Sequence, residues 1–229
     1  MNVLVVFAKD PARGKSRLAA TIGRKSATQV ARSLLVDAIE LGRRAGEAEI
    51  GVSLAVADPT PETDATMQAL AADLPREPQV GATLGERLSH SMQQWFARGA
   101  ARVVIIGTDC PTLSIDEIAL AFELLAFNDA VLGPASDGGY HLIGCSAPKA
   151  RLFDGIDWDS PRVLEQTVAG VRRQRLSLRL VPQLSDIDTA DDLPIVFGQL
   201  EARLTAYQQQ GQATYWTLHS VLHRMRAAS

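Results

Sequence analysis

The sequence predicts an α/β protein with a single three-layer α/β/α domain, in which helices cover both faces of a mainly parallel sheet. Short apolar runs typical of strands alternate with longer stretches of helical periodicity along the chain. No low-complexity linker, internal repeat or sharp change in composition divides the 229 residues, which are enough to bury one substantial core. Ligands of such sheets bind at the carboxyl ends of the strands, so we expect function in the loops that follow strands.

The expected strands are short β-branched and apolar runs bounded by turn residues. They are Asn2–Phe7, Ile50–Ala57, Arg102–Ile106, Asp129–Gly133, Tyr140–Gly144 and Leu176–Val181.

Helices are expected between these strands, and several of their starts carry a chemical signature. Ala27–Ala45 has apolar residues at helical spacing. Asp58-Pro-Thr-Pro-Glu62 is predicted to be a surface turn. The expected starts are the capping boxes at Thr83 and Ser114, a similar pattern at Thr189, and Ser160 followed by proline.

A last helix is expected from Ala213 onward, because Leu218, Val221, Leu222 and Met225 recur at helical spacing. This apolar stripe either closes the core or forms the contact of a homodimer. We therefore predict one main domain over residues 1–204 and a helical extension over residues 205–229 that packs on it.

Charge and hydropathy exclude several classes of protein. Lys and Arg number 23 against 26 Asp and Glu, a formal charge of -3, which argues against a nucleic-acid-binding surface. The apolar opening Val3–Ala8 is too short for a signal peptide or a membrane span, so we expect a cytoplasmic protein with no membrane partner. Cys110 and Cys145 are expected to be reduced.

The segment Lys9–Arg17 follows the first expected strand and carries a net charge of +3, because it holds four cations and one aspartate. Gly14 allows a ligand close to the backbone, and the cations could bind a di- or triphosphate; the alternative is a solvated basic turn. Lys9 stands where a Walker A motif needs glycine, and no dinucleotide fingerprint follows any strand, so NAD is not expected. The cations are Lys9, Arg13, Lys15 and Arg17.

Asp109 lies at the carboxyl end of the expected strand Arg102–Ile106, in the turn Gly107–Pro111. Mg²⁺ takes one or two carboxylates together with phosphate oxygens, so this aspartate is a candidate metal ligand. Its alternative role is that of a turn or capping residue. Cys110 is interpreted as a packing residue rather than a nucleophile.

Ser136–His141 joins two expected strands through Asp137 and paired glycines. A tight hairpin turn explains the pattern as well as a substrate loop does. In the substrate loop, Asp137 would act as a base or bind a hydroxyl, and Tyr140 or His141 would contact the acceptor.

Four carboxylates lie between Ser185 and Leu193, and the two that fall in a helical first turn, Asp191 and Asp192, are interpreted as structural. Asp186 and Asp188 precede that turn, and Asp188 is the favoured second metal ligand. His219 and His223 have i, i+4 spacing without further ligands, so we expect exposed helix histidines.

Taken together, these segments resemble the DUF2064 family of glycosyltransferase-A-like proteins, in the right order over about residues 1–200. The resemblance rests on Phe7–Pro11, Lys15–Leu18, Leu84–Arg87, Gly107–Leu113, Gly133–Gly144, Gly155–Trp158 and Asp186–Thr189.

The resemblance implies the α/β sandwich of the nucleotide-diphospho-sugar transferase superfamily, which is GT-A-like and Rossmann-like. It also implies a nucleotide held by the first loop through Lys9, Arg13, Lys15 and Arg17, with Mg²⁺ or Mn²⁺ on Asp109 and Asp188. Gly14, Gly85 and Asp109 are further predicted nucleotide-binding residues. The first loop looks two residues shorter than the family form and closer to that of phospholactate guanylyltransferases.

The leading hypothesis is an Mg²⁺-dependent enzyme that transfers a nucleotidyl group from a nucleoside triphosphate to a phosphorylated or acidic small-molecule acceptor. Lys15, Arg17 and Asp137 are its candidate catalytic residues, and Lys15 and Arg17 would neutralise phosphate charge. The alternatives are a glycosyltransferase that uses a nucleotide-sugar, with Asp137 as the base, and a non-catalytic nucleotide-binding protein.

Overall fold

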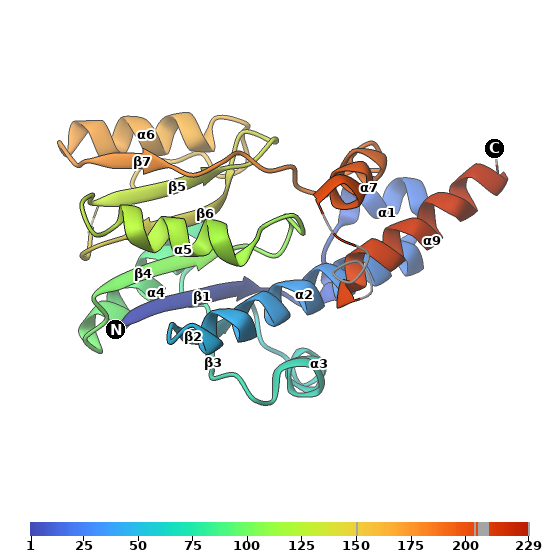
Figure 1. Ribbon diagram of the computed structural model, residues 1–229, viewed down its shortest axis with the longest axis horizontal. Helices are drawn as coiled ribbons and strands as arrows, with labels where there is room; N and C mark the ends of the chain where they lie inside the picture. The colour runs from blue at the N-terminus through green and yellow to red at the C-terminus, as the bar shows by residue number, and fades with distance from the viewer. Residues whose placement is uncertain (150, 204, 206–210, 229) are drawn as a thin grey trace.

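The centre of the protein is a seven-stranded sheet in the order β3-β2-β1-β4-β6-β5-β7. The computed structural model describes residues 1–149, 151–203, 205 and 211–228 (Figure 1). The strand predictions are confirmed to within two residues, and the short edge strand β3 is an addition to them. The strands are β1 Asn2–Ala8, β2 Gly51–Val56, β3 Arg76–Pro78, β4 Arg102–Ile106, β5 Ala130–Pro134, β6 Tyr140–Cys145 and β7 Leu178–Leu180.

Strand directions bring the functional loops to one edge of the sheet. β6 is antiparallel to both neighbours, β4 and β5, and every other adjacent pair is parallel. The carboxyl ends of β1, β4, β5 and β7 therefore lie along the same edge as the amino end of β6. The mainly parallel α/β/α sandwich is confirmed.

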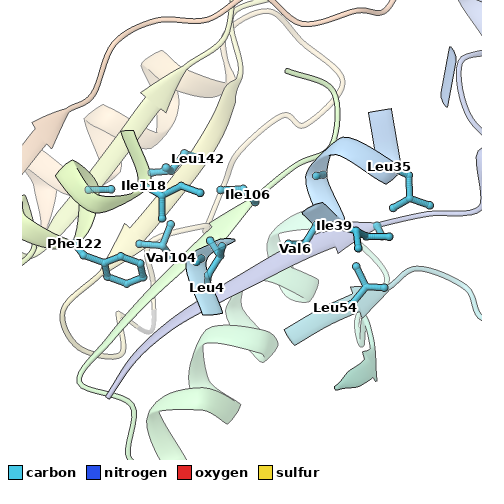
Figure 2. Close-up of a cluster of buried hydrophobic side chains, with 14 of the residues drawn as sticks. Leu4, Val6, Leu35, Ile39, Leu54, Val104, Ile106, Ile118, Phe122 and Leu142 are labelled. Atoms are coloured by element: carbon cyan, nitrogen blue, oxygen red, sulfur yellow. The ribbon is translucent and has the colours of Figure 1, made fainter. Parts of the chain in front are cut away.

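Helices cover both faces of the sheet because the strands alternate their buried side chains between the two faces. Leu4 and Val6 point to one face, while Val3 and Val5 point to the other. Figure 2 shows the first cluster, in which Leu35 and Ile39 of one helix and Ile118 and Phe122 of another lie over the strands. The first face packs α2 Arg24–Glu47, α3 Pro61–Ala71 and α5 Ile115–Leu124, and the second packs α4 Leu84–Ala97 and α6 Val163–Arg173.

A third apolar cluster lies beyond the sheet edge that carries the carboxyl ends of the strands (Figure 1). It joins the first half of α2 to α1 Ser16–Ile22, α7 Asp192–Arg203 and α9 Ala213–Ala228. Leu218, Val221 and Leu222 are buried in it, and Met225 packs against it. The α9 stripe therefore contacts α2 and α7. The predicted boundary at Leu204 lies outside the described residues.

Of the four predicted helix starts, two are confirmed and two are wrong. The capping boxes at Thr83 and Ser114 are confirmed, with both side-chain hydrogen bonds present in each. The starts at Thr189 and Ser160 are wrong: α7 begins at Asp192, which itself accepts the Thr189 N–H, and α6 begins at Val163. The supposed surface turn at Asp58 is also wrong beyond its first residues, because Thr60 caps α3 and Pro61 opens it.

Both cysteines, Cys110 and Cys145, are buried and free. In the described part of the chain, no helix combines the length and apolar character needed to cross a membrane.

Asp37 ties the start of α9 to α2. Its Oδ1 and Oδ2 accept the Ala213 and Thr214 backbone N–H groups, each at 2.8 Å. These N–H groups lie in the first turn of α9, where no intrahelical partner exists. Burial raises the pKa of the Asp37 carboxyl above its usual value, although hydrogen bonds from Thr214 and Ala213 oppose the shift.

Replacing Asp37 with alanine is expected to loosen α9, because two N–H groups lose their acceptors. The expected cost is about 1–3 kcal/mol, with a fall in Tm of roughly 2–4 °C per kcal/mol for a chain of this size. Calorimetry of Asp37→Ala beside the exposed-site control Glu123→Ala measures it, and hydrogen exchange should rise first in α9. An unchanged Tm with unchanged exchange in α9 would show that Asp37 does not hold this helix.

Candidate functional site

Three segments that follow strands meet at the carboxyl edge of the sheet through direct hydrogen bonds. The Ile187 N–H donates to the Asp109 carbonyl at 3.0 Å, and the Lys15 ammonium donates to the Ile187 carbonyl. The loop after β1, the loop after β4 and the segment after β7 are thereby joined. The predicted residues Lys15, Asp109 and Asp188 are brought together, although they are far apart in the sequence.

Lys15 lies inside this junction rather than on its surface. Its backbone is left-handed, at φ 54° and ψ 45°, immediately before α1. The side chain is 2% exposed, and Nζ lies 2.8 Å from Asp109 Oδ1. A buried ammonium needs such partners because its desolvation is costly. Lys15 is therefore committed to protein groups in this structure.

The other cations of the loop remain at the surface. Lys9, Arg13 and Arg17 are exposed, and Arg17 forms a 2.8 Å ion pair with Asp188 Oδ2. Gly14 is buried, and a Cβ there would lie 3.2 Å from Lys9 Cε, so the aliphatic part of Lys9 packs over this glycine. Of the four cations between Lys9 and Arg17, Lys15 alone is buried.

Arg24 on α2 also holds the loop, since its guanidinium donates to the Gly14 carbonyl at 2.8 Å. Sequence reasoning missed this residue because it lies in a helix and carries no motif. Its positive charge, seven residues after the cationic segment Lys9–Arg17, was the one available signal.

Asp109 and Asp188 have the chemistry that a divalent cation requires. Their side chains are 42% and 35% exposed, and each uses one oxygen for an ion pair, Asp109 Oδ1 and Asp188 Oδ2. Within the described residues, no group of three or more His, Cys, Asp or Glu side chains is arranged to hold a metal. Two carboxylates completed by phosphate oxygens and water suit Mg²⁺, so the residues fit a metal that binds together with a nucleotide.

Asp186 connects this junction to the β5–β6 loop. Its Oδ1 accepts a hydrogen bond from Ser136 Oγ at 2.8 Å, and its side chain is buried. Burial raises the pKa of the Asp186 carboxyl, and the nearby charge of Asp137 raises it further. Asp186 therefore positions the hairpin, while Asp188 faces the cationic loop. The partner Ser136 was not singled out from the sequence.

The paired glycines of the hairpin have structural reasons to be there. Gly138 has φ +89°, and a Cβ on it would lie 2.0 Å from the Pro161 carbonyl oxygen. Asp137 is exposed and its Oδ1 accepts the Gly139 N–H at 2.8 Å, as in an Asx turn. Asp137 thus lies at the edge of the sheet that carries the other candidate residues, and the turn does not use its Oδ2. Its role as a base remains a prediction.

The two ring side chains after this turn do not face the site. The Tyr140 ring packs edge-on against Trp158, and its hydroxyl is buried. His141 is 5% exposed and fills the space over Gly133, and burial lowers the pKa of its imidazole. The suggestion that either residue contacts an acceptor finds no support in these positions.

Gly85 has a packing partner of its own. It is buried in the first turn of α4, where a Cβ would lie 2.9 Å from the Trp158 indole. Trp158 was noted only as part of a motif, and its contact with Gly85 explains why both motifs occur. Nucleotide binding at Gly85 remains a prediction.

Cys110 is a buried neighbour of the acidic residues. Burial raises the pKa of its thiol well above the usual value, and the charges of Asp186 and Asp109 raise it further. The thiolate is the nucleophilic form, so this environment supports the interpretation of Cys110 as a packing residue.

A cavity of about 310 Å³ lies between α2, α7 and the Gly107–Ile115 loop. Its lining includes Thr108 and Cys110 but none of the predicted phosphate-binding or metal-binding residues. The candidate site is therefore an open edge of the sheet rather than this cavity.

Comparisons with known proteins agree with the fold. The sequence model of the family described as "Uncharacterized protein conserved in bacteria (DUF2064)" matches residues 41–160, which include Asp109 and Asp137 but not the cationic loop or Asp188. A crystal structure from Desulfovibrio desulfuricans G20, provisionally described as a nucleotide-diphospho-sugar transferase, matches with 29% identity and a TM-score of 0.89 over 99% of this chain and 98% of that one. Among curated proteins, no match is found.

More distant structures share only the fold. A CMP:2-keto-3-deoxy-manno-octonic acid synthetase complexed with CTP has 13% identity and a TM-score of 0.56, over 89% of this chain and 99% of that one. The 4-diphosphocytidyl-2C-methyl-D-erythritol synthase of Anaerococcus prevotii DSM 20548 has 13% identity and a TM-score of 0.56, over 87% and 99%.

Substitution of Gly138 by alanine is expected to displace the hairpin, because the residue has a positive φ and its Cβ would collide with backbone. We expect a loss of about 2–4 kcal/mol in the free energy of unfolding, because the added methyl group brings steric overlap as well as the backbone strain of a positive φ. Denaturant unfolding measures it, with Gly198→Ala on α7 as the control, where a Cβ meets no atom within 4 Å. Equal stability of the two variants would contradict this reading of the turn.

The Lys15–Asp109 pair is testable by a double-mutant cycle. Lys15→Met or Asp109→Asn alone should cost about 2–3 kcal/mol, somewhat less than a fully buried pair because Asp109 is half-exposed. The double variant should lose much less free energy of unfolding than the sum of the two single losses. Additive losses measured by denaturant unfolding would mean that the pair does not contribute as a pair.

Proposed function

The chain belongs to the DUF2064 family, and on that premise we propose that it transfers a nucleotidyl group from a nucleoside triphosphate to a phosphorylated or acidic small-molecule acceptor. The observation that carries the proposal is that two cations after β1, the buried Lys15 and the exposed Arg17, pair with the carboxylates Asp109 and Asp188 on neighbouring loops. The CTP-bound synthetase with the same fold supports a nucleotide as the ligand.

In this reaction an acceptor oxygen attacks the α-phosphorus of the triphosphate. The bond from that phosphorus to the oxygen bridging to the β-phosphate breaks, and pyrophosphate leaves. Lys9, Arg13 and Arg17 neutralise the polyphosphate charge, which lowers the repulsion that the attacking oxygen meets. The chemistry requires position and electrostatics more than proton transfer.

Asp109 and Asp188 would hold Mg²⁺ or Mn²⁺, which supplies charge stabilisation on the phosphate oxygens. Lys15 keeps the Asp109 carboxylate in place through the 2.8 Å ion pair. Asp137, exposed on the hairpin, is available to accept the proton of an acceptor hydroxyl.

A second candidate is glycosyl transfer from a nucleotide-sugar. It is favoured by the provisional description of the 29% identical Desulfovibrio structure. In that reaction Asp109 would hold the metal, which would supply charge stabilisation to the diphosphate, and Asp137 would deprotonate the acceptor hydroxyl. A protein that binds nucleotides without turnover is the remaining alternative.

A release assay separates these functions. With Mg²⁺ and a panel of nucleoside triphosphates and acidic acceptors, we expect pyrophosphate release that EDTA abolishes. Asp109→Asn should lower kcat/KM by about 10²-fold or more, as loss of a charge-stabilising group does. Arg224→Gln, on the exposed end of α9, is the control and should keep wild-type kinetics.

Release of a nucleoside diphosphate from nucleotide-sugars, with no pyrophosphate from any triphosphate, would overturn nucleotidyl transfer and support glycosyl transfer. Metal-dependent nucleotide binding without turnover would support the non-catalytic alternative. Full activity of Asp109→Asn would exclude this site from either reaction.

A further inference from the structure

Both predicted metal carboxylates already have a cation as partner, and both cations come from one short segment. Lys15 Nζ lies 2.8 Å from Asp109 Oδ1, and two residues later Arg17 lies 2.8 Å from Asp188 Oδ2. We call these the inner and the outer ion pair. Each cation uses one oxygen of its carboxylate, and its positive charge lowers the affinity of that carboxylate for a divalent cation.

The two ion pairs differ sharply in burial. In the inner pair the lysine side chain is 2% exposed and also donates to the Ile187 carbonyl. In the outer pair the arginine side chain is 76% exposed, and the Asp188 side chain is 35% exposed. A buried ion pair is costly to break, whereas an exposed one exchanges its partners easily. The outer pair is therefore the one that a ligand can open.

Arg17 has a stronger alternative partner in the proposed substrate. A polyphosphate carries several negative charges, and a guanidinium can donate two parallel hydrogen bonds to a phosphate group. Arg17 is the second residue of α1 and belongs to the same cationic segment as the exposed Lys9 and Arg13. A phosphate bound by these cations would compete with Asp188 for the Arg17 guanidinium.

We propose that the outer ion pair couples metal binding to nucleotide binding. Without nucleotide, Arg17 neutralises Asp188 and keeps its affinity for a divalent cation low. Polyphosphate draws Arg17 away, and Asp188 then becomes available to the metal beside Asp109. This inference rests on the proposed function. It extends that function by giving Arg17 two opposite effects, because Arg17 weakens metal binding in the free protein and strengthens phosphate binding.

The coupling predicts effects of opposite sign on two ligands. Arg17→Gln removes the competitor of the metal at Asp188, so it should bind Mn²⁺ alone about 3–10-fold more tightly than the wild type, the size of a modest coupling. The same change removes a phosphate ligand, so affinity for tripolyphosphate without metal should fall about 10-fold or more. Calorimetric titration with each ligand measures both effects on the full chain.

Two controls isolate the pair from general charge effects. Arg224→Gln removes the same charge from α9 and should change neither affinity by more than about 2-fold. In an Asp188→Asn background, Arg17→Gln should no longer tighten Mn²⁺ binding, because the group that Arg17 neutralises is gone. Thermal unfolding confirms that each variant is folded, and little change is expected since Arg17 is exposed.

Unchanged or weaker Mn²⁺ binding in folded Arg17→Gln would overturn the coupling. Tighter binding that persists in the Asp188→Asn background would overturn it as well, because Arg17 would then act elsewhere. The Mn²⁺ titration needs no nucleotide, so its failure is distinct from that of the proposed function. The latter fails if the wild type releases no pyrophosphate, whatever the metal affinity of the variant.

Discussion

The ion pair between the buried Lys15 and the half-exposed Asp109 is the interaction on which the candidate site depends. A lysine ammonium is stable inside a protein only where carboxylate and carbonyl oxygens replace its water. Here those oxygens come from two other loops, through Asp109 and the Ile187 carbonyl. Because one cation requires both partners, the loops after β1 and β4 and the segment after β7 are fixed relative to one another. The exposed charges of the site acquire their positions from this junction.

The sheet makes that junction possible. β6 is the one strand of the described sheet that runs against its neighbours, so the hairpin between β5 and β6 reaches the same edge as the carboxyl ends of the parallel strands. Ser136 on that hairpin then bonds to Asp186, one residue before Ile187. A fourth segment thus joins the site through a short polar contact. The apolar cluster of α1, α7 and α9 packs behind this edge and supports the cationic segment through Leu18.

Most of the fold could be predicted from the sequence because periodicity reports burial directly. Short apolar runs located six of the seven strands, and the helical spacing of α2 located its buried face. β3 consists of Arg76, Glu77 and Pro78, so it lacks the β-branched residues of such a run. The start at Thr189 failed because α7 begins at Asp192, whose side chain accepts the Asp188 and Thr189 N–H groups of the preceding turn. For the site, the sequence identified Lys15, Asp109 and Asp188, but it could not show that Lys15 is buried and Arg17 exposed. The burial of Lys15 depends on contacts with Asp109 and the Ile187 carbonyl, which are distant in the sequence.

In the proposed function, the exposed cations of the β1 loop bind nucleotide phosphates opposite Asp109 and Asp188, while Lys15 remains a structural partner of Asp109. A crystal structure with Mg²⁺ and a non-hydrolysable nucleoside triphosphate tests this arrangement most directly. We expect phosphates on Arg13 and Arg17, the metal beside Asp109 and Asp188, and the Lys15–Asp109 contact intact. A triphosphate bound away from this edge, or one bound by Lys15 with its ion pair to Asp109 broken, would contradict it.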